Sequence, residues 1–504
     1  MNHKEHKGHK VILRDCKDYD PNRLYSIILD GFEELGLRPA GKIFIKPNAV
    51  FSSGYNPHAY TQPVVLQALV RVLKKFNPNK ITLGEDCGLM VPTRYAFERA
   101  GYFNLIKKEK IGYTLLDEDR NKVRVPVAGQ VHSSLLLPRE WLSADCKIYV
   151  PKLKSHSQTT ITNALKLSIG LVDRSERLLG HHYLLDEKIA DLAVACPPDL
   201  VITDAVLVGQ LGAGLPKPYP LGLLIIGKNS LSVDSVAASI LGHNPETIGH
   251  FQAAFKRGLG TIDLNEIEIT GDVTLAEAQA RAKDFEQEPD DANQLNPRIR
   301  FFIGGLARSV SENLNGEGTV GDKSRNNIFL RCSVGKVGGT LALLKNKMGE
   351  NSNLNFLHPV YRHTPKATAP GVASDCTGGC LGFAREAILF INAYNNEHPL
   401  SKFVQRLVNP RSFKPRTIAL VIGDYKNSIP DQAGPILLVG DCARVDSRYR
   451  HRIIKRLAGC PVFMGRSVFH FAQSAGLTNP YVDVKEGYPF LKNWVRKGLK
   501  KIIR

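Results

Sequence analysis

Long apolar runs alternate with helix-like patterns over about the first 270 residues of this chain. The chain between these runs shows helical spacing of its apolar positions, as in 63–76 and 234–241, and a final apolar stretch at 265–272 is typical of an edge strand. Continuous apolar runs predict strands that are buried on both faces. We therefore expect an α/β fold with a mainly parallel sheet covered by helices. The predicted buried strands are 42–48, 80–86, 146–152, 199–208 and 220–228.

The pattern changes after residue 272 and resumes its alternation in the last third of the chain. A helix-like stretch at 274–285 gives way to polar, glycine-rich and asparagine-rich segments, which predict a connecting region over 273–362. The remaining residues, 363–504, predict a smaller C-terminal α/β domain behind the N-terminal α/β domain of residues 1–272. In this C-terminal part the predicted helices are 381–394, 446–457 and 488–504, and the predicted strands are 417–425 and 435–441.

Composition is that of an ordinary globular protein, with 43% hydrophobic and 23% charged residues in 504. No apolar run approaches the roughly 18 residues that span a bilayer. The start, MNHKEHKGHK, lacks the apolar core of a secretion signal. We therefore expect a cytoplasmic location.

The net charge of +19 raises the question of nucleic-acid binding. The sequence shows no RNP-type aromatic motif, no zinc-finger spacing and no long arginine-rich arm, so specific nucleic-acid binding is not expected. The charge is concentrated near the C-terminus, where 431–504 contains fourteen Lys/Arg against five Asp/Glu. Such a surface attracts acidic partners, among them an acidic electron-carrier protein or anionic lipid.

The predicted final helix is basic and amphipathic. Its apolar residues fall roughly on one face, with lysines and arginines around the other. Peripheral membrane contact is one interpretation, and packing on its own domain with a solvated outer face is the other. The apolar face comprises Leu491, Trp494, Val495, Leu499 and Ile502.

Polar side chains gather just past the ends of the predicted strands, where α/β sheets commonly bind ligands. Lys46 and Asn48 end the first strand, and Glu85 and Asp86 end the second. The densest stretch is PKLKSHSQTTITNALKLSIG, at 151–170. Basic residues and hydroxyls beside a helix N-terminus favour anion binding, although a solvated basic loop is the alternative.

Within that stretch, a helix is expected from the spacing of Thr159, Ile161, Leu165 and Ile169. Lys166 lies inside the predicted helix. The residues that follow it, Arg174, His181 and His182, extend the polar set, and for the two histidines a packed or surface role is the alternative.

Gly209, Gly212 and Gly214 follow the strand that ends at Val208. A dinucleotide-binding loop needs a helix after its glycines, whereas the next element here is the apolar strand 220–228. We therefore interpret these glycines as a wide turn.

Several of these segments together resemble the domain of unknown function 362 family: IKPN and the T-x-P after it, the run from PKLKSH to KLSIG, DLVITDA and SVDSVAASILG. The resemblance covers roughly residues 10–272. Proteins of that family often carry iron–sulfur modules, and the family implies no established reaction. Leu167 and Leu215 depart from its usual asparagine and glycine-proline, so the pocket of this chain can differ from those of its relatives.

The family pattern implies a set of site residues when it is transferred residue by residue. We expect the lysines among them to hold a carboxylate or phosphate, and His156 to transfer protons because its ordinary pKa lies near neutrality. The expected substrate-binding residues are Lys46, Asn48, Lys152, Lys154 and Thr159, and the expected catalytic residues are His156, Lys166 and Asp234.

Four cysteines in the last third form the other candidate site: Cys376, Cys380, Cys442 and Cys460. Each lies within two residues of a glycine, and Cys460 also precedes a proline, so the backbone there can wrap around an inorganic centre. Four thiolates suit a four-iron, four-sulfur cluster, or zinc as the alternative. A third alternative is that these four are unrelated buried cysteines or redox thiols.

Part of the cysteine pattern is similar to nickel–iron hydrogenase small subunits and the related subunit of respiratory NADH:quinone oxidoreductase. The C-x-x-x-C of Cys376 and Cys380 departs from their usual C-x-x-C, and the gap from Cys442 to Cys460 is short. The other cysteines lie far apart, and we expect most of them to be small buried residues. They are Cys16, Cys87, Cys146, Cys196 and Cys332.

The sequence thus predicts a redox-active iron–sulfur protein with an N-terminal site for an anionic substrate, and an oxidoreductase is one form it can take. A binding or assembly protein with a structural metal is one alternative. A non-redox enzyme that acts on a phosphorylated or carboxylated small molecule is the other.

Overall fold

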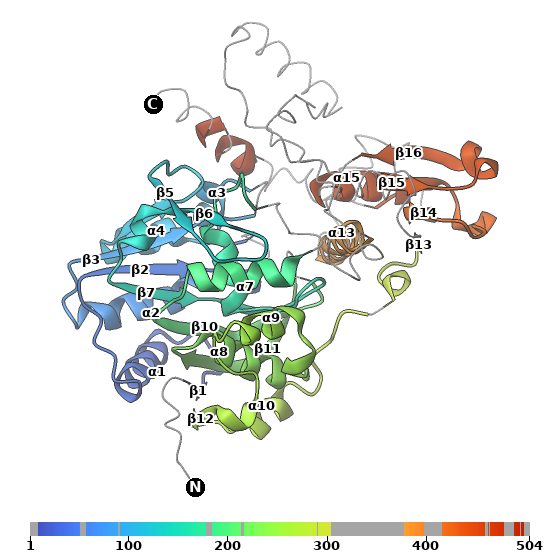
Figure 1. Cartoon of the computed structure of the whole chain (residues 1–504). Coiled ribbons are helices and arrows are strands. Elements are labelled where there is room, and N and C mark those ends of the chain that lie inside the picture. Colours follow the sequence, from blue (N-terminus) through green and yellow to red (C-terminus); the bar gives the residue numbers. More distant parts are fainter. Residues whose placement is uncertain are drawn as a thin grey trace, which may run out of the picture.

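A computed structural model shows a ten-stranded and a four-stranded sheet, each with helices packed on it, and a small two-stranded sheet (Figure 1). All structural statements below concern the residues that it describes. These are 9–50, 57–88, 91–177, 184–212, 216–289, 291–303, 377–397, 416–458, 462, 464–477, 488–493 and 495–497.

The larger sheet contains ten strands, eight of them in one continuous path. The remaining two, β8 (Lys152–His156) and β9 (Thr160–Thr162), form an arm that is attached to β10 through β8. The path runs in the order β12 (Glu268–Gly271), β1 (Lys10–Asp15), β11 (Lys217–Gly227), β10 (Leu200–Gln210), β7 (Cys146–Val150), β2 (Lys42–Pro47), β3 (Lys80–Glu85) and β4 (Gly112–Leu115).

Most strand pairs of this sheet are parallel, including β10–β7, β7–β2, β2–β3 and β3–β4. Only the pairs that involve β11 and the β8–β9 pair are antiparallel. The predicted α/β class with a mainly parallel N-terminal sheet is confirmed, and β12 lies at the sheet edge as expected.

The side chains of successive strand residues point to opposite faces of the sheet, so they pack against different layers of helices. Ile43 and Ile45 pack with one layer of helices, whereas Phe44 between them packs with the other. The first layer contains α1 (Pro21–Glu34), α2 (Pro63–Lys74), α3 (Thr93–Arg99) and α4 (Tyr102–Glu109). The second contains α6 (Ala164–Leu167), α7 (Leu185–Ala195), α8 (Ser230–Ile240), α9 (Gly249–Lys256) and α10 (Leu275–Arg281), with the small β5 (Lys122–Pro126), β6 (Ser134–Pro138) and α5 (Arg139–Leu142) beside them.

The glycine-containing segment after Val208 is a hairpin turn. Strand β10 continues to Gln210 and pairs antiparallel with β11, so a strand follows these glycines. Leu211 and Gly212 have φ of 57° and 118° in this turn, a region of backbone conformation that favours glycine. The absence of a helix after these glycines agrees with the interpretation against a dinucleotide-binding loop, and residues 213–215 lie outside the described residues.

The smaller sheet is parallel throughout, and two helices pack on one of its faces. The helices α13 (Thr377–Glu397) and α15 (Met464–Ala475) share a core with the sheet, and α13 confirms the helix predicted at 381–394. The strand order is β13 (Ile299–Ile303), β14 (Ile418–Asp424), β15 (Ile436–Arg444) and β16 (Ile453–Leu457). Its first strand, β13, comes from the stretch that sequence analysis assigned to the connecting region.

The predicted helix at 446–457 is wrong. The structure has a 3-10 helix, η10 (Ser447–Arg452), which Asp446 caps by accepting the Arg448 N–H, followed by strand β16. The apolar pair Ile453 and Ile454, with basic residues around it, fits the spacing of a helix as well as that of a strand. Pairing with β15 makes this segment a strand.

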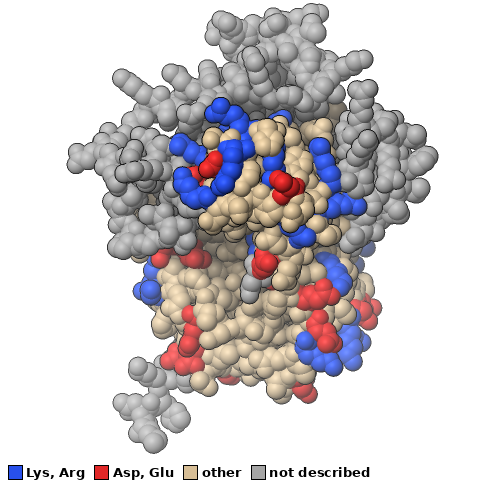
Figure 2. Space-filling view, turned by 90° about the vertical axis from the view of Figure 1, so that its right-hand side faces the viewer, with Lys and Arg blue, Asp and Glu red and all other residues tan. Residues whose placement is uncertain are grey.

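Basic side chains gather over the smaller sheet, in the upper part of Figure 2. The exposed basic residues of η10 and β16 include Arg448, Arg450, Lys455 and Arg456. Their position agrees with the concentration of charge that the sequence shows near the C-terminus. Among the described helices, none combines the length and apolar character that crossing a bilayer requires.

Candidate functional site

The segment with the densest polar residues is a hairpin, which corrects the predicted helix from Thr159 onward. Strands β8 and β9 pair antiparallel, with Lys154 opposite Thr162 and His156 opposite Thr160. Thr160 has φ of 59°, which is rare for a β-branched residue and costs of order 1–3 kcal/mol. Backbone strain of this kind is concentrated at functional sites, so the turn of this hairpin is a candidate for function.

Helix α6 starts only after the hairpin, and Asp234 of α8 holds its first turn. The Asp234 carboxylate accepts the N–H groups of Ala164 and Leu165 at 2.8 and 3.0 Å. Burial raises the pKa of Asp234 to about 7, and these hydrogen bonds oppose the rise. The contacts show Asp234 positioning α6, and its expected catalytic role stays a prediction.

Lys154 and Lys166 both have pKa values that lie near neutrality. The Lys154 side chain is buried, and its ammonium donates to the Ala59 carbonyl at 2.7 Å. Burial of the ammonium lowers the pKa of each lysine to about 7, because desolvation disfavours the charged form. The positive charge of Lys154 lowers the pKa of Lys166 further, while the Glu386 carboxylate raises the pKa of both.

Glu386 comes from α13, more than two hundred residues away along the chain. It accepts the Ser157 hydroxyl at 2.8 Å and lies 3.4 Å from the Ser157 N–H, in the turn of the β8–β9 hairpin. Leu389 of the same helix lies against the β10–β11 turn, where a Cβ on Gly212 would come within 3.3 Å of the Leu389 Cβ. Helix α13 therefore joins the smaller sheet to the polar arm of the larger one.

Glu288 adds a second acid to this cluster. Its side chain is 8% exposed, and among the described residues neither of its oxygens has a hydrogen-bond partner. Burial, followed by the charge of Glu386, raises the pKa of Glu288 to about 8. The nearest cation is Arg385, at 3.8 Å. Glu288 is thus expected to be largely protonated at neutral pH.

We call Lys154, Ser157, Lys166, Glu288 and Glu386 the junction site. The name reflects that Glu386 comes from α13, which packs on the smaller sheet, whereas the lysines and Ser157 belong to the larger domain. Amines and a carboxyl that titrate near neutrality can exchange protons at little cost. Hydroxyl and amide donors of the hairpin turn already hold one carboxylate, that of Glu386. The arrangement therefore combines proton transfer with the recognition of an anionic group.

Two other predicted binding lysines are neutralised by the protein itself. The Lys46 ammonium lies 2.7 Å from Glu85, and the Lys152 ammonium lies 2.9 Å from Asp204. Tyr19 joins the second pair by accepting from Lys152 at 2.8 Å. These internal ion pairs account for the burial of both lysines, and a direct role in substrate binding stays a prediction for each.

Gly170 gives the first of these pairs its space. A Cβ at this position would lie 2.3 Å from a Glu85 oxygen and 2.6 Å from the Lys46 nitrogen, so a side chain here would displace the ends of this ion pair. This explains why the KLSIG run ends on glycine.

The remaining predicted site residues lie on the same edge of the sheet. Asn48 is buried, its N–H donates to Thr61 at 2.9 Å, and its side-chain oxygen has no partner among the described residues. The Thr159 hydroxyl donates to the Ile161 carbonyl, and His156 Nδ1 accepts the Gln158 N–H at 3.1 Å. Both therefore lie in the hairpin itself, next to Ser157, and their predicted roles in binding and proton transfer stay predictions.

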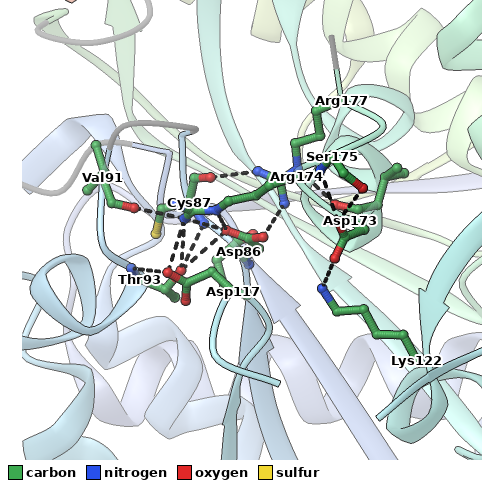
Figure 3. A network of polar contacts seen from close by, with 12 residues as sticks. Asp86, Cys87, Val91, Thr93, Asp117, Lys122, Asp173, Arg174, Ser175 and Arg177 are labelled. Carbon is green, nitrogen blue, oxygen red and sulfur yellow. Dashed lines mark hydrogen bonds and ion pairs between the residues drawn. The ribbon is translucent and has the colours of Figure 1, made fainter. Parts of the chain in front are cut away.

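A second polar network, centred on Arg174, lies at the end of β3 (Figure 3). Arg174 donates to Asp86 at 2.7 Å and lies 3.4 Å from Asp117, and Arg177 lies 2.9 Å from Asp86. Both arginines follow the Lys166 segment in the chain, as expected for Arg174. Asp117 and Arg177 were missed, because nothing in the sequence near either of them marks a strand end. The carboxylates of Asp86 and Asp117 hold the two guanidinium groups in place inside the protein.

Of the four candidate ligand cysteines, only Cys380 has a described side chain. It lies in the first turn of α13 and is buried in the core of the smaller sheet. The backbone of Cys442 belongs to β15, but its side chain, together with Cys376 and Cys460, lies outside the described residues. His181 and His182 lie outside them as well. The predicted cluster therefore stays a prediction.

The expectation for the scattered cysteines is confirmed for most of those that are described, and Cys332 lies outside the described residues. Cys16, Cys87 and Cys196 are buried, and Cys146 is partly buried. Burial raises the pKa of the Cys196 thiol to about 12, which keeps it protonated and unreactive.

Comparisons with known proteins support part of the resemblance. Residues 43–239 match the family described as Domain of unknown function (DUF362), which confirms the resemblance over that part of the chain. The chain is also 26% identical over 261 residues to a thylakoid-associated protein of Synechocystis sp.. That alignment covers 49% of this chain and 79% of the relative. The similarity of the cysteine pattern to hydrogenase sites stays a prediction.

Among solved structures, the lactate racemase apoprotein from Thermoanaerobacterium thermosaccharolyticum is similar, with a TM-score of 0.32 and 11% sequence identity. The superposition covers 47% of this chain and 59% of that one, so this chain spans less than two thirds of that protein's length.

Proposed function

We propose that the protein is an enzyme that binds a small carboxylate- or phosphate-bearing molecule at the junction site. The observation that carries this proposal is the pair Lys154 and Lys166, both with a pKa of about 7, beside a carboxylate that the hairpin turn already holds. Glu386 occupies the place of an anion in this arrangement. A ligand carboxylate or phosphate that displaces it meets the same Ser157 donors and the same two lysines.

The proposed chemistry is proton transfer. A lysine with a pKa near 7 is divided between ammonium and amine at neutral pH, so one can bind the anion while the other accepts a proton. Glu288, with its pKa of about 8, is protonated under the same conditions and can donate. His156 lies at the end of β8 next to Ser157 and is the further candidate for a proton donor or acceptor.

The test is a thermal-shift screen of small carboxylates and phosphates against the wild-type chain. A compound that raises the melting temperature of the wild type is expected to raise that of Lys166→Met little or not at all. Lys188→Met is the matched control, because Lys188 is also buried with a pKa of about 7 but lies in α7, outside the junction site.

The control variant is expected to keep the full response. A ligand that stabilises Lys166→Met as much as the wild type would show that it binds elsewhere. If no compound of either class stabilises the wild type, the proposed substrate class is wrong.

A second candidate function is electron transfer through a four-iron, four-sulfur cluster held by Cys376, Cys380, Cys442 and Cys460. Four soft thiolates suit that cluster, and the same set suits structural zinc. One structural observation supports the candidate: α13 carries Cys380 in its first turn and Glu386 farther along, so a metal centre there would belong to the helix that completes the junction site. The cluster would supply one-electron chemistry, and an acidic carrier protein would be the matching partner.

Metal and sulfide analysis of protein purified under nitrogen tests this candidate. Iron and acid-labile sulfide in equal amounts are expected, with both reduced in Cys380→Ser, while Cys196→Ser serves as a control that keeps both. Stoichiometric zinc without sulfide would favour a structural metal and an assembly role. His156→Ala is expected to leave the metal content unchanged and to lower turnover.

A further inference from the structure

The terminal helix, which we define as residues 488–497, is docked on the larger domain through one face. Its backbone is helical at 488–493 and 495–497. The Phe490 ring packs edge-on against Tyr95 of α3 with the ring centroids 5.4 Å apart, and Phe490 joins the core layer on that side. The Asn493 amide is fully buried and donates to Glu98 at 2.9 Å.

A lysine fixes the far end of the same face. The Lys497 ammonium bonds the buried carboxylate of Asp117, which also pairs with Arg174 (Figure 3). These cations hold the pKa of Asp117 well below its usual range, so the contact persists at physiological pH. The inward face of the terminal helix is therefore fixed by one apolar and two polar contacts, and the outward face is determined with it.

The outward face is apolar. Tyr488, Leu491 and Val495 are 70%, 54% and 45% exposed. Their spacing of three and four residues places them in one stripe on a helix. Among the described residues nine large hydrophobic side chains are exposed, and this helix contributes three of them, including the two most exposed. Exposed apolar residues that occur singly need no explanation, but a stripe on one helix indicates a contact surface.

Cations border one side of this stripe. Arg496 is exposed next to Val495, and Lys492, next to Leu491, is partly exposed while its ammonium lies 3.4 Å from Glu98. The sequence continues with Lys500, Lys501 and Arg504. Long basic side chains can extend their charged ends past an apolar layer to reach an anionic one. Apolar side chains with a border of cations are the features of a helix that lies in the plane of an anionic membrane surface.

We propose that the terminal helix attaches this protein peripherally to anionic lipid bilayers through Tyr488, Leu491 and Val495, with Lys492 and Arg496 at the headgroups. A bilayer fits better than an acidic protein, because an acidic partner would need only the cations, whereas here three exposed apolar side chains form the stripe and Lys492 and Arg496 border it on one side. The docked face keeps its contacts with α3, so binding requires no unfolding. The inference is independent of the junction site.

The test is co-sedimentation of the full chain with vesicles. The wild type is expected to bind vesicles of mixed phosphatidylglycerol and phosphatidylcholine, and to bind pure phosphatidylcholine far less. Leu491→Ser/Val495→Ser is expected to lower the partition coefficient about tenfold or more, because two exposed apolar groups no longer enter the interface. Neither residue is buried, so this variant should keep its melting temperature.

The matched control is Val194→Ser/Phe255→Ser, which removes two apolar side chains that are 41% and 44% exposed in α7 and α9. It is expected to bind the mixed vesicles as the wild type does. Three results would overturn the proposal. These are no binding of the folded wild type to mixed vesicles, equal loss in both double variants, or a wild-type dimer in solution that Leu491→Ser/Val495→Ser dissociates, which would make the stripe an interface between copies of the chain.

Discussion

Two properties mark the buried lysines around the strand ends: a close ion pair with a buried carboxylate, and a pKa near neutrality. Lys152 and Asp204 have 0% exposed side chains and lie 2.9 Å apart, so each charge has its partner inside the protein. Lys154 donates to the carbonyl of Ala59. Desolvation of its ammonium lowers the pKa of Lys154 to about 7, while the charge of Glu386 raises it. A lysine that titrates near neutrality can change its charge when a ligand binds.

A lysine in a close ion pair should be structural, and Lys152 is the residue that tests this. Lys152→Met leaves Asp204 charged, buried and without its ammonium, so the free energy of unfolding should fall by about 3–5 kcal/mol. Urea unfolding measures the loss. The double variant Lys152→Met/Asp204→Leu should recover much of it, because no unpaired charge remains. A loss below about 1 kcal/mol in the single variant would mean that the pair contributes little to stability.

Sequence reasoning found the residues that stand beside strand ends and missed their partners. Lys154 follows a strong apolar strand, and the family pattern singles out both Lys154 and Lys166. Glu288 and Glu386 carry no comparable signal, since a single acid in a polar stretch or on a helix is ordinarily a solvated residue. Only the packing of α13 on the β8–β9 arm shows that these acids face the lysines.

Among the elements, long apolar strands were predictable and short polar ones were not. The strands β2, β7, β10 and β11 are apolar enough to identify from the sequence alone. Strand β8 reads KLKSH and resembles a solvated loop, because the sequence does not show that Lys152 and Lys154 are buried. The spacing of Thr159, Ile161 and Leu165 fits a helix, yet Thr160 turns the chain in a left-handed conformation and β9 forms instead.

For helix α13, the sequence predicted the helix but not its contacts with the larger domain. Its apolar positions predicted a helix at 381–394, and they pack on the smaller sheet as that pattern requires. The opposite contacts, of Glu386 with Ser157 and of Leu389 with the turn at Gly212, depend on residues from a distant part of the chain. The helical spacing of apolar residues identifies the face of a helix that is buried in the core. It does not identify which part of the protein the polar residues of the helix contact.

At the scale of the whole molecule, helix α13 connects the two larger sheets, because it packs on the smaller of them and contacts the β8–β9 hairpin of the other. The β8–β9 hairpin supplies Lys154 and Ser157, α6 supplies Lys166, and α13 supplies Glu386. Any ligand that displaces Glu386 must therefore act on α13, which also carries Cys380. The terminal helix is the other long-range contact, and it docks on α3 through residues nearly four hundred positions away.

The central claim is that Lys166 titrates near neutrality under the influence of Glu386. The most direct measurement is the rate at which Lys166 is acetylated in the folded protein as a function of pH. The protein is digested after labelling, and mass spectrometry of the peptide that contains Lys166 gives the rate. The wild type should show half-maximal reactivity near pH 7. Glu386→Gln removes a charge that raises the pKa of Lys166, so the midpoint should move to lower pH. A midpoint near that of free lysine, or one that Glu386→Gln leaves unchanged, would contradict the account.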